Sequence, residues 1–74
     1  MVRLTFKPCG SNPNYMPVTD KDTGEEVGYI QSGNSGRIKI SLFDGNYQTT
    51  VHNYKAALGF VMGVEAVLNY HDFV

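Results

Sequence analysis

The fold is decided by residues 37–45, which read Arg37-Ile38-Lys39-Ile40-Ser41-Leu42-Phe43-Asp44-Gly45. Every second side chain from Ile38 to Leu42 is apolar, and this period of two residues is typical of a strand with one buried face. An Asp-Gly pair directly after such a strand is the strongest short signal for a tight hairpin. We therefore predict a strand over residues 37–43, a hairpin at Asp44-Gly45 and a short return strand over residues 46–49.

Three further strands are predicted on the amino-terminal side of this hairpin. Residues 2–7 alternate apolar and polar side chains, and residues 15–19 form a weaker strand. Pro17 would place that weaker strand at a sheet edge, because proline lacks a backbone donor. A turn over residues 20–25, in which Gly24 supplies a positive φ, leads into a strand over residues 26–31. The pattern leaves open which face of this last strand is buried.

A single helix is predicted after the hairpin, from about residue 51 to Asn69 or Tyr70, with Thr49 or Thr50 as its N-cap. Its apolar stripe would cover one face of a three- or four-stranded antiparallel sheet, which makes residues 1–74 one α+β domain. The predicted core consists of Val2, Leu4, Phe6, Ile38, Ile40, Leu42, Tyr54, Leu58, Val61 and Leu68.

Length and cysteine content narrow the ways in which this domain is stabilised. A chain of 74 residues builds a small core, and such domains often rely on disulfides, metals or a partner subunit. Cys9 is the only cysteine, so no disulfide can form within the chain, and a lone thiol favours a reducing, cytoplasmic setting. Cys9, His52 and His71 lack the spacing of a metal site, so we expect neither metal nor cofactor. Association with another protein is the remaining source of stability.

Composition also disfavours several function classes. The longest apolar stretch, residues 56–68, is shorter than the roughly 20 residues that cross a bilayer, so no membrane partner is expected. The net charge of −1 argues against a chain-wide basic field for nucleic acid. Cys9, His52 and His71 could supply a nucleophile and a base, but no pattern brings them together. We therefore predict no catalytic residues and a protein that is not an enzyme.

One face of the predicted helix collects small side chains. Two mid-helix glycines each cost roughly 1 kcal/mol relative to alanine, and a missing Cβ lets another backbone approach closely. That backbone would belong either to a partner, as in a homodimer, or to the domain's own sheet. The predicted interface consists of Ala56, Gly59, Phe60, Met62, Gly63, Ala66 and Val67.

The outward face of the predicted sheet carries four of the six basic residues. Arg3 and Lys7 lie on one strand, and Arg37 and Lys39 lie on another. If these strands are neighbours, the face could contact phosphates, with Phe43 available for stacking. Solvated strand faces also commonly carry such side chains without binding anything.

The preferred function is a small, non-catalytic protein-binding or regulatory accessory protein. An example would be a phage-type inhibitor of a host protein. It would act through its helix, as a homodimer or with another protein partner whose identity the sequence does not reveal. The grounds are the small size, the lack of a catalytic set and the broad apolar surface of the helix. The alternative is a nucleic-acid-binding module that uses the basic outer face of the sheet.

Overall fold

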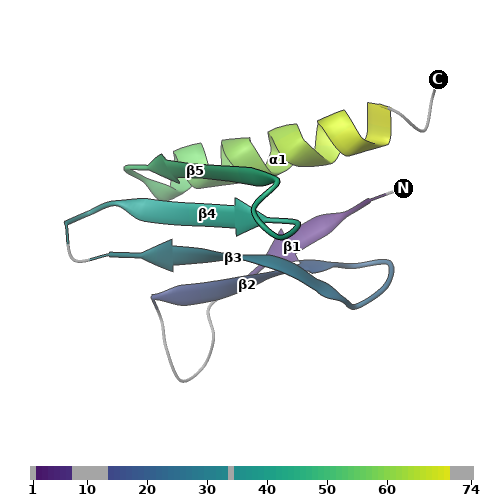
Figure 1. Cartoon of the computed structure of the whole chain (residues 1–74), viewed down its shortest axis with the longest axis horizontal. Helices are drawn as coiled ribbons and strands as arrows, with labels where there is room; N and C mark the ends of the chain where they lie inside the picture. Colours follow the sequence, from purple (N-terminus) through teal and green to yellow (C-terminus); the bar gives the residue numbers. More distant parts are fainter. Residues whose placement is uncertain (1, 8–13, 34, 71–74) are drawn as a thin grey trace.

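The computed structural model describes residues 2–7, 14–33 and 35–70, and it has a five-stranded antiparallel sheet with one helix on one face (Figure 1). The predicted α+β class is therefore confirmed, with five strands in place of three or four. The elements are β1 (Leu4–Phe6), β2 (Tyr15–Asp20), β3 (Glu26–Ser32), β4 (Ile38–Leu42), β5 (Tyr47–Val51) and α1 (Tyr54–Tyr70). The strand order in the sheet follows the sequence, so each strand pairs with the next one along the chain.

The face of the sheet beneath α1 forms the core. Residues that lie directly opposite each other in a sheet point to the same side, so the pairs Met16↔Ile30 and Ile30↔Ile40 form one apolar layer. Val18, Ile30, Ile40 and Leu42 are fully buried in this layer. Gly28 and Ile30 therefore lie on the buried face of β3, which answers the question that the sequence pattern leaves open.

The hairpin at Asp44-Gly45 forms as predicted. Asp44 and Gly45 have φ of 57° and 85°, and the Asn46 N–H donates to the Phe43 carbonyl at 3.2 Å, which is a type I′ turn. Phe43 also has a positive φ, of 54°, and this interrupts the alternation of β4. Its ring packs edge-on against Tyr47, with the ring centroids 6.2 Å apart.

The return strand is longer and the helix begins later than predicted. Thr49, Thr50 and Val51 continue β5, because β-branched side chains favour a pleated strand. The N-cap is Asn53 rather than a threonine, and its Oδ1 accepts the Ala56 N–H at 2.8 Å. The helix ends at Tyr70, as predicted.

Pro17 does not mark an edge strand, because β2 lies between β1 and β3. The last pair of β1 is Phe6↔Val18, so β1 ends before it reaches Pro17. Pro17 therefore pairs only with Tyr29 of β3 and has no partner on the β1 side. Such a locally one-sided position tolerates proline although the strand as a whole is internal.

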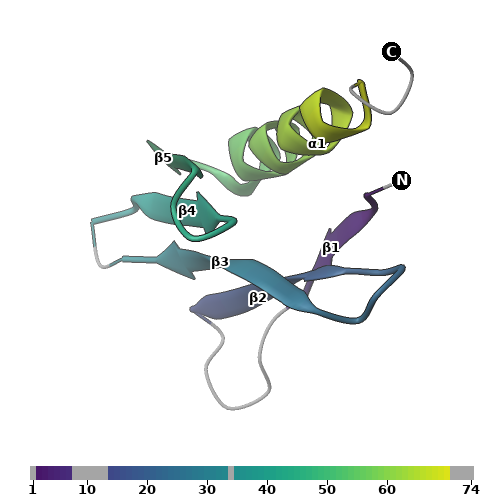
Figure 2. The same cartoon turned by 45° about the vertical axis from the view of Figure 1, so that its right-hand side comes forward.

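The helix packs on the sheet through a narrower stripe than predicted. Ala57, Val61 and Val64 are buried, whereas Tyr54 and Leu58 are 48% and 47% exposed, so these two do not belong to the core. Tyr54 and Leu58 lie in the first half of α1, on the same side of the helix that contacts β1 in its second half. Because β1 has only three residues, it covers this side only along the second half of α1, and Tyr54 and Leu58 stay uncovered (Figure 2).

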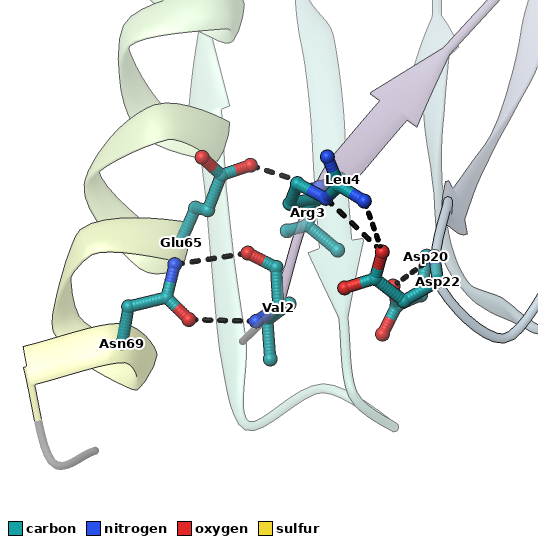
Figure 3. Close-up of polar contacts among 7 residues, drawn as sticks. All are labelled: Val2, Arg3, Leu4, Asp20, Asp22, Glu65 and Asn69. Carbon is teal, nitrogen blue, oxygen red and sulfur yellow. Dashed lines mark hydrogen bonds and ion pairs between the residues drawn. The ribbon is translucent and has the colours of Figure 1, made fainter.

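Two polar side chains of α1 cover the open edge of the amino-terminal strand (Figure 3). The Asn69 side chain accepts the Val2 N–H at 2.7 Å and donates to the Val2 carbonyl at 2.9 Å. Glu65 Oε2 accepts the Leu4 N–H at 2.8 Å. Four helical residues rise by about 6 Å and two strand residues by about 6.6 Å, so the two spacings match. We call these three hydrogen bonds the edge clamp.

Candidate protein interface

The edge clamp and the buried stripe together determine which side of α1 points to solvent. Ala57, Val61 and Val64 face the sheet, and the clamp residues Glu65 and Asn69 face β1. The opposite side of the helix has no other element of the described chain against it in either view (Figures 1 and 2). This outward side contains Lys55, Ala56, Gly59, Met62, Gly63 and Ala66, all of which are exposed.

Every large apolar side chain that is exposed in the described part of the chain lies on α1. These residues are Tyr54, Leu58, Met62, Val67 and Tyr70, with exposed fractions of 48%, 47%, 59%, 49% and 66%. The helix has only two charged residues, Lys55 and Glu65, and Glu65 belongs to the edge clamp. Of the exposed apolar residues, Met62, Val67 and Tyr70 lie on or beside the outward side, whereas Tyr54 and Leu58 lie on the side that faces β1. Solvated helix faces are usually charged or polar, and the outward side of α1 has a single charged residue, Lys55, so it has the composition of a surface that is buried in an assembly.

The two mid-helix glycines are not needed for packing within the chain. Within the described part of the chain, a Cβ placed on Gly59 or on Gly63 would meet no atom within 4 Å, apart from the helix itself and the glycine's chain neighbours. The interpretation that these glycines allow close helix-on-sheet packing is therefore wrong. Each still weakens the helix by about 1 kcal/mol relative to alanine, a cost that contact with another molecule would offset.

An apolar groove of about 410 Å³ lies beside these glycines, between α1 and β5. It is lined by Tyr47, Gly59, Phe60, Gly63, Val64 and Val67. The structure thus brings the predicted interface residues together on one side of α1. All of them are exposed except Phe60, which is half buried against the core.

The predicted basic face is not assembled, because β2 and β3 separate β1 from β4. Arg3 and Lys7 therefore do not neighbour Arg37 and Lys39, as the prediction requires. Arg3 is also engaged, since its Nε and Nη2 donate to Asp22 Oδ1 at 3.0 and 2.6 Å. The hydrogen bond from Arg3 holds the pKa of the Asp22 carboxyl below its usual value.

The aromatic content of the outer face also differs from the prediction. The ring of Phe43 contacts Tyr47, whose position opposite Leu42 places it on the helix-covered face. Tyr15 and Tyr29 instead stack on the outer face, with ring centroids 5.8 Å apart and an interplanar angle of 19°. The sequence pattern misses this pair because it does not establish which face of residues 26–31 is buried.

Of the candidate catalytic residues, only His52 lies in the described part of the chain, where it is exposed before the start of α1. Cys9 and His71 lie outside the described residues. Among the residues that the structure describes, no three His, Cys, Asp or Glu side chains lie close enough to hold a metal ion. No helix within the described ranges has the length and apolar character needed to cross a membrane.

Comparisons of the chain with protein-family models, with curated proteins and with solved structures gave no match. No relative therefore supplies a function, and the outward side of α1 is the feature with the clearest functional consequence.

Proposed function

We propose that the chain is a small, non-catalytic protein-binding module of regulatory or accessory type that binds its partner through the outward side of α1. The observation that supports this function is that the described residues expose large apolar side chains only on α1, and that three of these, Met62, Val67 and Tyr70, lie on or beside its outward side. One example of this function is a phage-type inhibitor, which would bind a host protein through a contact of this kind.

Burial of apolar surface would drive the association. Met62 and Val67 are about half exposed or more, and removal of apolar area from water contributes about 25 cal/mol per Å². Of the two charged residues of α1, Glu65 is held in the edge clamp, which leaves Lys55 as the only charged residue that a partner would cover. A partner would thus remove little charged surface from water, which keeps the desolvation cost low.

A photoreactive phenylalanine analogue in place of Met62 tests this binding face. Irradiation in an extract of the natural host should give a covalent adduct with a protein, either a second copy of the chain or another protein. The matched control carries the same group in place of Gln48, an exposed residue on the outer face of β5. Equal adduct yields from both positions, or none from position 62, would contradict the proposal.

Nucleic-acid binding through Arg3, Lys7, Arg37, Lys39 and Phe43 is the weaker proposal, because these residues do not lie on neighbouring strands. It requires an affinity for single-stranded oligonucleotides that falls steeply with salt and drops in an Arg37→Ala/Lys39→Ala variant. Fluorescence anisotropy at low salt measures both effects. No binding at low salt, or unchanged affinity of the double variant, would exclude this alternative.

A further inference from the structure

The outward side of α1 has an internal symmetry that indicates a particular partner. Ala56, Gly59, Gly63 and Ala66 are spaced by three, four and three residues, so the set reads the same in both directions about Val61. We propose that the partner is a second copy of this chain. The two α1 helices would pack antiparallel about a two-fold axis that crosses their outward sides at the level of Val61. This inference rests on the function proposed above.

In this arrangement every small residue of the seam meets another small residue. Gly59 lies opposite the partner subunit's Gly63, and Ala56 lies opposite the partner subunit's Ala66. A spacing of three, four and three residues is that of the a and d positions of a heptad repeat, which form the seam between packed helices. Small residues at these four positions let the helix axes approach to about 8 Å, the short end of the usual range. The next seam position, Tyr70, is the last residue of α1 and lies beyond this close contact.

The charges of α1 favour an antiparallel pair over a parallel one. The helix has no acidic residue in its first turn and no basic residue in its last turn, so its own side chains do not compensate its macrodipole. An antiparallel neighbour places opposite helix ends side by side. It also separates the two Lys55 positions by twelve helical residues, or about 18 Å, which exceeds the Debye length of about 8 Å at physiological salt.

The size of this surface sets the expected strength of the dimer. Met62 and Val67, exposed by 59% and 49%, flank the seam and would be covered by the second copy. With 17 residues, α1 is about 25 Å long. A pair of such helices buries less than about 1,200 Å² in total, an area typical of weak, transient complexes. We therefore expect a reversible monomer–dimer equilibrium in the micromolar range.

Sedimentation equilibrium of the full chain, from about 5 to about 500 µM, measures this equilibrium. The mass of the wild type should rise from that of the 8.2 kDa monomer toward twice that value. Gly59→Gln and Gly63→Gln should each raise the dissociation constant at least about tenfold, because a side chain on the seam separates the helices. Urea unfolding at the lowest concentration verifies that both variants fold.

Leu58→Gln is the matched control. It places the same side chain at an exposed position of α1 that lies off the seam, and it should leave the dissociation constant within about twofold. A single monomeric species at all concentrations would overturn the inference. So would a control that weakens the dimer as much as the two glycine variants do.

Disulfide trapping tests the antiparallel geometry, in a Cys9→Ser background. Ala56→Cys/Ala66→Cys should form a covalent dimer on mild oxidation, because position 56 of one copy meets position 66 of the other within disulfide range. Ala56→Cys alone should form no covalent dimer. Efficient trapping of the single variant indicates a parallel pair and overturns the proposed geometry.

Failure of this inference is distinguishable from failure of the proposed function. If the wild type stays monomeric while the photoreactive group at position 62 labels a different protein, the second copy is the wrong partner and the binding face stands. If the chain is monomeric and position 62 labels nothing, both proposals are wrong.

Discussion

Gly28 lies where the backbone of β4 leaves no room for a side chain. A Cβ there would lie 2.2 Å from the Ser41 carbonyl oxygen and 2.8 Å from the Leu42 Cα. Relief requires movement of paired backbone rather than of a flexible side chain, so we expect Gly28→Ala to lower the free energy of unfolding by about 3 kcal/mol. Urea denaturation measures the change. A loss below about 1 kcal/mol would show that the two strands separate more easily than the structure implies.

Gly63 has the opposite environment, because its Cβ position is open. At protein concentrations where the chain is monomeric, Gly63→Ala should raise the free energy of unfolding by about 1 kcal/mol through helix propensity alone. Thermal or urea unfolding at about 1 µM measures this gain in the monomer, below the expected dissociation constant. A loss of stability at that concentration would mean that Gly63 serves packing within the chain.

The ion pair between Arg3 and Asp22 gives stability a dependence on pH. The hydrogen bond from Arg3 lowers the pKa of the Asp22 carboxyl in the folded state below its ordinary value of 3.8. This contribution is therefore present above pH 3.8 and is lost as the pH falls through the lower folded-state pKa. Asp22→Asn should flatten the pH dependence of unfolding below pH 3.8. Because both side chains are exposed, 0.5 M salt should reduce the difference between the variants. An unchanged acid profile would contradict this role.

Among the secondary-structure elements, those whose formation depends mainly on residues close in the sequence were predicted from local periodicity. The alternation over residues 37–43 identified β4, and Asp44-Gly45 identified its turn. The N-cap was misplaced because Thr49 and Thr50 suit both a cap and a strand, and pairing of β5 with β4 favours the strand.

The edge clamp could not be predicted in the same way. Glu65 and Asn69 are 61 and 67 residues away from the backbone groups that they bind. Their spacing of four residues on one side of a helix was the available signal, but it does not reveal which strand edge lies beside that side. The same missing information placed Leu58 in the predicted core, because the short extent of β1 decides whether that position is covered.

Loss of the edge clamp should destabilise β1 before the rest of the sheet. Asn69→Leu leaves the Val2 N–H and carbonyl without partners, and we expect a loss of about 1 kcal/mol in the free energy of unfolding. Amide hydrogen exchange at Val2 and Leu4 should accelerate, while exchange at Ile40 follows only the global change. The matched control is Lys55→Leu, at an exposed position of the same helix. Unchanged exchange at Val2 in Asn69→Leu would show that the clamp does not hold the strand.

At the scale of the whole molecule, the two candidate surfaces differ in what the sequence could establish. The small-residue side of α1 depends on helical periodicity alone, so its residues were predicted together and are found together. The basic face depends on the order of the strands in the sheet, which the sequence pattern does not reveal. Because each strand pairs with the next one along the chain, β2 and β3 lie between β1 and β4.

The proposed association of two copies of the chain through the outward side of α1 can be followed residue by residue. The most direct measurement is a series of amide ¹H–¹⁵N spectra of the uniformly labelled chain recorded at increasing concentration. We expect concentration-dependent shifts at Ala56, Gly59, Met62, Gly63 and Ala66. Shifts confined to the outer face of the sheet around Tyr29 and Lys39, with the α1 amides unchanged, would contradict the proposed association.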